Sequence, residues 1–147
     1  MKDTQNRRDY RNIPIDKVGI KNLRYPITVR DRRDGFQHTV ATINMYVNLP
    51  HDYKGTHMSR FVEMLHELNP EVSLQGFSAI LENMKTHLDA ASAHMEMTFP
   101  YFMKKNAPIS GVQSLMNYQV TLIGDCGDDH CDITTRVTVP VTSLCPC

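Results

Sequence analysis

Apolar and polar residues alternate along two adjacent stretches in the first third of the chain. Tyr25, Ile27 and Val29 alternate with polar neighbours up to "RDRRDG", whose Asp-Gly pair is typical of a tight hairpin turn. The next stretch places apolar residues on one face, at Ala41, Ile43, Met45, Val47 and Leu49. A period of two over this length predicts an antiparallel hairpin with one buried face.

After Pro50 the spacing of apolar residues becomes helical. A first helix is predicted with Thr56 as its N-cap, ending at Asn69-Pro70, and its apolar stripe is Met58, Phe61, Val62, Leu65 and Leu68. A second helix is predicted from about Leu74 to Asp89, with an inward face formed by Phe77, Ile80, Leu81, Met84 and Leu88. Each helix would bury one face only.

Strand patterning returns after the helices. Met95, Met97 and Phe99 alternate with polar residues, and Pro100 and Pro108 are predicted to bound an irregular stretch. The segments "SLMNYQVTLIG" and "CDITTRVTVPV" are further strands on either side of the turn "DCGDDH". The order strand, strand, helix, helix, strand, strand predicts an α+β fold, a four-stranded antiparallel sheet with two helices packed on one face. Its exposed edges favour association into homo-oligomers.

Length and charge limit the class of protein. The chain has 147 residues, 41% of them hydrophobic, which suffices for one domain with its own core. Residues 1–20 show no sustained periodicity and are interpreted as an extended N-terminal arm. Lys plus Arg equals Asp plus Glu at 16 each, so nucleic acid and acidic membranes are not expected partners. The chain lacks an apolar run of ~20 residues and a secretory h-region, which predicts a cytoplasmic protein.

The four cysteines lie in two groups along the sequence, with two cysteines in each group. In a reducing compartment they are expected to be free thiols, metal ligands or nucleophiles rather than disulfides. Cys126 and Cys131 have the spacing C-x4-C, unlike the C-x2-C of structural zinc sites, and are interpreted as solvent-facing turn thiols. Cys145 and Cys147 flank Pro146 after the last strand, where two sulfurs are presented together. They are candidates for catalysis or metal binding, with incidental terminal thiols as the alternative.

Two other polar groups are candidates for chemistry. "KGTHMSR" opens the first helix, and free N–H groups at a helix start, with nearby cations, can hold a phosphate, although an ordinary cap explains the same residues. His94 and Glu96 lie two residues apart on one strand face. They could act as an acid and a base, but a surface hydrogen-bonded pair is the favoured interpretation.

Several segments together resemble a known family. "NIPIDKVGIKNLRYPITV", "HTVATINMYVNLP", "GTHMSRFVEML", "SAHMEMTFPYF" and "VPVTSLCPC" resemble the type IB GTP cyclohydrolases of the GTP cyclohydrolase I family, over nearly the whole chain. The resemblance implies the tunnelling fold, two units in tandem, homotetramers, and conversion of GTP to 7,8-dihydroneopterin triphosphate and formate. This reaction is the first step of tetrahydrofolate biosynthesis.

The resemblance also implies roles for individual residues. Cys145 would ligate a catalytic divalent metal (zinc, manganese or similar), with Cys147 close to the same site. Ser59 and Arg60 would hold the triphosphate, with His57 adjacent. Residues 21–147 would form the first tunnelling-fold unit and stop inside the metal motif, so the partner His, the acidic ligand and the guanine-binding Glu are expected beyond Cys147.

Two other functions stay open at this point. One is a non-catalytic tunnelling-fold module that oligomerises or binds a purine or a metal. The other is an interaction module that binds zinc through all four cysteines.

Overall fold

The computed structural model describes residues 10, 13–51, 55–67, 71–127, 129–141 and 143. Within them lie two helices and six strands, β1 (Ile15–Asp31), β2 (Gly35–Leu49), α1 (Met58–Glu67), β3 (Glu71–Val72), α2 (Leu74–Leu88), β4 (Ala93–Asn106), β5 (Gln113–Cys126) and β6 (Cys131–Thr138). Residues 145 and 147, predicted as catalytic, lie outside the described residues.

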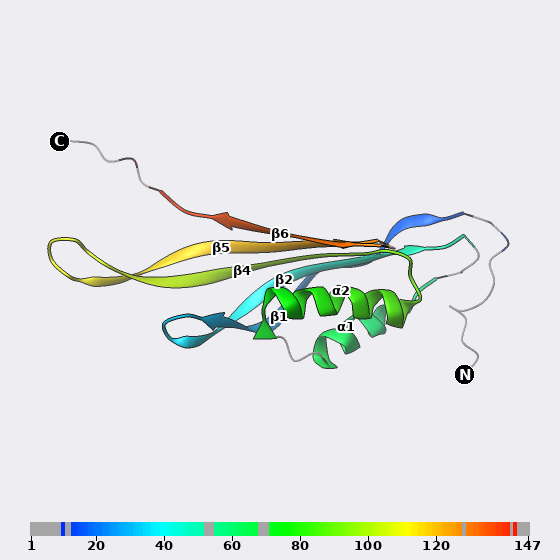
Figure 1. Ribbon diagram of the computed structural model, residues 1–147, viewed down its shortest axis with the longest axis horizontal. Helices are drawn as coiled ribbons and strands as arrows, with labels where there is room; N and C mark the ends of the chain where they lie inside the picture. Colours follow the sequence, from blue (N-terminus) through cyan, green and yellow to red (C-terminus); the bar gives the residue numbers. More distant parts are fainter. Residues whose placement is uncertain are drawn as a thin grey trace.

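The strands form one sheet in the order β3-β1-β2-β4-β5-β6. The five long strands are antiparallel to their neighbours, and the short β3 pairs with β1 in parallel. Figure 1 shows both helices on the same side of the sheet, near one end, while the β4–β5 hairpin extends past them at the other end. The predicted α+β class and the one-sided helix pair are confirmed, and β1 begins inside the predicted arm.

The predicted number of four strands is wrong. Five segments alternate in the sequence, and all five take a place in the antiparallel sheet. The predicted break at Pro100 is also absent, because β4 continues to Asn106 and Pro100 pairs with Gln119 of β5. The carbonyl of Pro100 accepts a bond from Thr39 of β2, so its nitrogen faces the same side, where the β2–β4 ladder has already ended at Thr98. Proline has no N–H, but at this position no strand pairing requires one, so Pro100 leaves the sheet intact.

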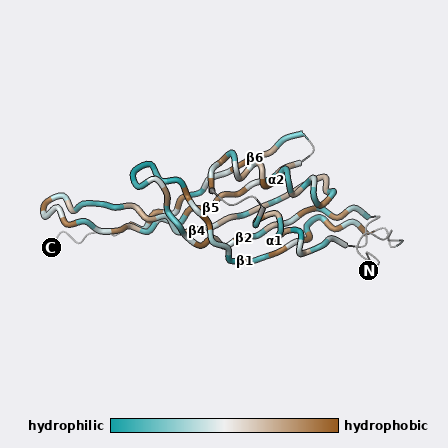
Figure 2. Tube along the Cα trace, turned by 90° about the horizontal axis from the view of Figure 1, so that it is seen from below, coloured by the Kyte–Doolittle hydropathy of each residue, from teal (hydrophilic) through white to brown (hydrophobic). Residues whose placement is uncertain are grey.

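The core lies between the helices and the sheet. The predicted face of β2 is confirmed, because all five of its apolar residues are buried. The predicted face of α2 also holds at Phe77, Ile80, Leu81 and Met84. Figure 2 shows hydrophobic and hydrophilic positions alternating along the strands, as a sheet with one covered face requires.

The predicted stripe of α1 is partly wrong. Phe61 and Leu65 are buried as expected, but Met58 and Val62 are each 41% exposed, Met64 is buried instead, and Leu68 lies outside the described residues. Positions 61, 64 and 65 follow the i, i+3, i+4 rule, and Val62 falls on the flank of that stripe.

The ends of α2 follow the expected chemistry: Ser73 accepts the N–H of Gly76, and Asp89 ends the helix in the left-handed conformation.

A carboxylate fixes the turn between β1 and β2. Asp31 accepts the backbone N–H groups of Arg33 and Asp34 at 2.7 and 2.9 Å and the hydroxyl of Tyr101, from β4, at 2.7 Å. The backbone N–H of Asp34, followed by the Tyr101 hydroxyl, holds the pKa of Asp31 well below its usual range. The Asp31 carboxylate in turn raises the pKa of Tyr101 to about 12. This cluster therefore joins the β1–β2 turn to β4.

We expect the Tyr101 bond to be lost only in strong alkali. A phenol ordinarily titrates near pH ~10, so the stabilisation is complete below that pH and disappears as the pH rises towards about 12. Tyr101→Phe should cost about 1.5–3 kcal/mol of unfolding free energy at neutral pH, because the bond is to a charged carboxylate, and less in alkali. It should also remove the highest step of an ultraviolet tyrosinate titration. Tyr10→Phe, at an 86% exposed position, is the control and should leave that step in place.

Candidate functional site

The start of α1 places two of the three predicted phosphate-binding residues in one cavity. His57 and Arg60 line a cavity of about 250 Å³, together with residues at the end of β2 and the end of α2. The N–H of Arg60 donates to the carbonyl of His57 at 3.2 Å, and its Nη1 donates to the carbonyl of His87 at 3.3 Å. Ser59 is exposed on the same first turn and does not line the cavity. The structure thus brings Arg60 and His57 together and leaves Ser59 beside them.

Opposite charges meet in this cavity. Asp89, the residue that ends α2, lines it with Arg60 and His57. A phosphate bound here would gain from the guanidinium and from the positive end of the helix dipole at the start of α1. The Asp89 carboxylate would oppose it. The cavity is therefore suited to an anion only if Arg60 and the helix start outweigh Asp89.

A second cavity contains a histidine–carboxylate pair that sequence reasoning missed. His94 on β4 lies opposite Asp125 on β5, and its Nδ1 is 2.5 Å from Oδ1 of Asp125. The ring of His94 stacks on Tyr46 of β2, with 6.0 Å between ring centroids. The three residues line a cavity of about 230 Å³. A carboxylate on one ring nitrogen fixes the imidazole so that the other nitrogen can exchange a proton, as in general acid–base sites.

The predicted pair of His94 and Glu96 is wrong. Glu96 accepts a hydrogen bond from Asn44 of β2 at 3.2 Å, whereas His94 pairs with Asp125. Both side chains are on the same strand face, but their polar partners come from different neighbouring strands, β2 for Glu96 and β5 for His94. The spacing of two residues on one strand indicated the shared face, and only the register of β4 against β5 could indicate Asp125.

The interpretation of Cys126 and Cys131 as free, solvent-facing thiols is also wrong. The two residues face each other across the β5–β6 hairpin, with their Cα atoms 4.1 Å apart, and are joined by a disulfide. Cys126 is only 2% exposed because it continues the buried face of β5 that includes Tyr118 and Leu122. The burial signal was present in the sequence, since residues 118, 122 and 126 share one strand face.

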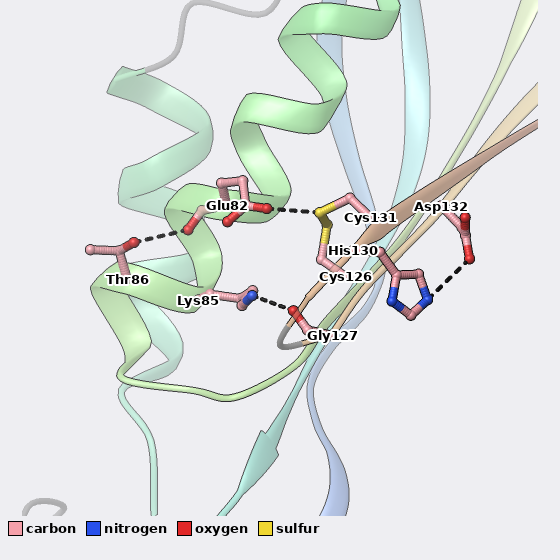
Figure 3. The surroundings of a disulfide bond; sticks show 8 residues. All are labelled: Glu82, Lys85, Thr86, Cys126, Gly127, His130, Cys131 and Asp132. Carbon is pink, nitrogen blue, oxygen red and sulfur yellow. Dashed lines mark hydrogen bonds and ion pairs between the residues drawn. A yellow bond between two sulfur atoms is a disulfide. The ribbon is translucent and has the colours of Figure 1, made fainter.

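Only one group of potential metal ligands occurs among the described residues. It consists of Glu82, Cys126 and Cys131. Figure 3 shows Glu82 extending from α2 towards the disulfide. Cys145, predicted as the metal ligand, and Cys147 lie outside the described residues.

Comparison with known proteins identifies the family. Residues 1–147 match the family model described as type I GTP cyclohydrolase folE2. The chain belongs to this family. The match is to folE2 and not to the GTP cyclohydrolase I family named from the sequence, and the broader assignment to the type I GTP cyclohydrolases is confirmed.

Curated folE2 relatives are similar over the whole chain. GTP cyclohydrolase FolE2 from Desulfosudis oleivorans is 62% identical over 148 residues, which cover 100% of this chain and 57% of the relative. The protein of the same name from Methylobacillus flagellatus is 58% identical, covering 100% of this chain and 55% of the relative. The chain therefore spans a little over half the length of these curated relatives. In the part of the chain that the structure describes, neither α1 nor α2 is long and apolar enough to cross a membrane.

Proposed function

We propose that this chain forms part of a cytoplasmic GTP cyclohydrolase that converts GTP to 7,8-dihydroneopterin triphosphate and formate, the first step of tetrahydrofolate biosynthesis. The observation that carries the proposal is the match of residues 1–147 to the folE2 family. The identity of 62% to a protein named GTP cyclohydrolase FolE2 supports it. GTP is the proposed substrate.

The same proposal extends to the fold and the assembly. Residues 21–147 form a tunnelling-fold unit, and several such subunits associate into a homo-oligomer, a tetramer in the complete enzyme. Support comes from β6, the last strand in the order of the sheet: Val137 on this strand is 54% exposed, and Val139, just after its end, is 48% exposed. These two valines line an apolar groove of about 480 Å³ with Phe99 and Tyr118 on the half of the sheet that extends past the helices. A neighbouring subunit would cover such a surface.

A divalent metal, zinc or manganese, is proposed as the cofactor, with Cys145 as a ligand and Cys147 close to it. Such a metal, when bound, lowers the pKa of a water so that a nucleophile exists near neutral pH. Catalytic zinc sites use three protein ligands. The motif "CPC" contributes at most two thiolates, so it does not complete the set by itself, and the other ligands would come from other residues of the complete enzyme.

The proposed site for the triphosphate is the start of α1. Arg60 supplies a fixed positive charge at the cavity, the first turn supplies backbone N–H groups, and Ser59 and His57 lie on either side of Met58 at the helix start. The role of Arg60 is to hold and orient the phosphates, so that the guanine is presented to the reacting groups.

Formate release tests the proposed reaction. This chain and the same chain completed to the length of its relatives would be incubated with GTP and Mn²⁺ or Zn²⁺, and formate would be measured. Release by the completed chain alone would show that residues 1–147 carry part of a divided site. Release by neither would contradict the proposal, and GTP binding without formate would favour the alternative, a non-catalytic oligomerisation or purine-binding module.

Arg60→Ala should weaken GTP binding by the completed enzyme. A hydrogen bond to a charged group contributes about 1.5–3 kcal/mol, which corresponds to a roughly 10- to 150-fold rise in KM for GTP. Arg60→Lys keeps the charge and should recover part of the loss. Arg136→Ala, at an exposed position on β6, is the control. An unchanged KM for GTP in Arg60→Ala would show that the start of α1 does not bind the phosphates.

A further inference from the structure

Three groups that bind transition metals meet between α2 and the β5–β6 hairpin. A carboxylate oxygen of Glu82 and the sulfurs of Cys126 and Cys131 all lie within 4.8 Å of one another. Each comes from a different element, α2, β5 or β6, and Figure 3 shows all three directed to the same point. The proposed GTP reaction gives none of them a role.

The contact between Glu82 and Cys131 can be a hydrogen bond only when the disulfide is open. Oε1 of Glu82 lies 2.8 Å from Sγ of Cys131. A disulfide sulfur carries no proton, so in the oxidised form this contact is not a hydrogen bond. After reduction the Cys131 thiol can donate to the carboxylate, or the carboxylate and the sulfur can bind the same cation. The position of Glu82 thus suits the reduced pair of cysteines.

We propose that the reduced cysteine pair and Glu82 form a site for a thiophilic divalent ion such as Zn²⁺, and that the disulfide closes this site. Thiolates with a carboxylate are a donor set that zinc accepts, and three protein ligands leave a fourth position for water. A dithiol reductant supplies two electrons and two protons: its own sulfurs become a disulfide, and Cys126 and Cys131 become thiols. Binding of the ion then releases both thiol protons.

The local charges are compatible with a bound dication. Two thiolates and one carboxylate around Zn²⁺ leave a net charge of −1. Lys85 lies almost one turn after Glu82 on α2, and its Nζ donates to the carbonyl of Gly127, the residue after Cys126. Its ammonium group therefore stands beside the hairpin and offsets this charge. His130 is not directed to the cluster, since it pairs with Asp132 on the other side of the hairpin (Figure 3).

Cobalt binding tests the proposal without any measurement of catalysis. In the chain carrying Cys145→Ser and Cys147→Ser, Cys126 and Cys131 are the remaining cysteines. This chain would be titrated with Co²⁺ after reduction by a phosphine and, separately, in the oxidised form. We expect one equivalent of Co²⁺ and a thiolate-to-cobalt charge-transfer band in the reduced chain only, with the band removed by Zn²⁺.

Glu82→Gln is the decisive variant because it leaves both thiols and the disulfide intact. Loss of an outer-shell partner alone lowers metal affinity by about 10–100-fold, so loss of the direct Glu82 ligand should lower it at least as much. Glu63→Gln, an exposed carboxylate on α1, is the matched control. Equal affinities in the two variants would exclude Glu82 as a ligand and overturn the proposed site.

The absence of a charge-transfer band in the reduced chain would also overturn the proposal, provided that circular dichroism shows the chain folded. Binding of Co²⁺ with equal affinity by the oxidised chain, which has no thiolate and so gives no charge-transfer band, would place the ion elsewhere. Because Cys145 and Cys147 are absent from these variants, the outcome does not depend on the proposed GTP cyclohydrolase reaction. Each proposal can therefore fail separately.

Discussion

Replacing Phe61 by alanine should lower the unfolding free energy by about 3–5 kcal/mol. Phe61 is fully buried and, with Met64 and Leu65, forms the buried face of α1 among the residues whose side chains are described. The helix has only 10 residues, and isolated helices shorter than ~12–15 residues are marginal in water. Packing of this one face therefore holds α1, and with it Arg60, against the rest of the domain.

Denaturant unfolding measures this effect directly. Val62→Ala is the control, because Val62 is the next residue and is 41% exposed; its change should stay within about 0.5 kcal/mol. Phe61→Ala should also weaken GTP binding by the completed enzyme, since the start of α1 would lose its position. Equal unfolding midpoints for the two variants would mean that α1 is not held by its buried face.

The sequence predicted the elements whose pattern is local. The five apolar residues of β2 keep a strict period of two, and the four buried residues of α2 keep the helical period, so both buried faces were predicted correctly. In α1 the stripe is short: Met58 and Val62 lie on one flank of it, and Met64 lies on the other. Which of them is buried depends on how the helix rests on the sheet, and the sequence of the helix alone does not fix that.

The candidate site depends on the register of paired strands, which brings together residues that are far apart in the sequence. His94 and Asp125 are 31 residues apart and meet because β4 and β5 pair in one register over 14 residue pairs. The disulfide likewise requires Cys126 to lie inside the buried face of β5, whereas the predicted strand ended at Gly124. A prediction that extended this strand by two residues, to Cys126, would have placed the cysteine in the core. For Arg60 the helix start was enough to suggest a role, but the opposing Asp89 comes from the end of the other helix.

Gly124→Val should separate α2 from β5. A Cβ atom at Gly124 would lie 2.3 Å from Cδ1 of Leu81 and 2.8 Å from Cε1 of Phe77. Both side chains are buried and have no free space to enter. Overpacking of this kind costs about 1–3 kcal/mol, and the two extra methyl groups of valine place the expected loss at or above the upper end of this range. Denaturant unfolding measures it.

Gly127→Val provides the matched comparison, since nothing lies within 4 Å of a Cβ atom at that position. We expect its unfolding free energy to stay within about 0.5 kcal/mol of the parent chain. Leu81 directly precedes Glu82, so a shift of α2 in Gly124→Val would also carry the Glu82 carboxylate away from Cys131. The reduced Gly124→Val chain should then bind Co²⁺ more weakly than reduced Gly127→Val. If both variants bind Co²⁺ equally, the packing of α2 on β5 does not position Glu82, and this would count against Glu82 of α2 as a ligand of the proposed ion.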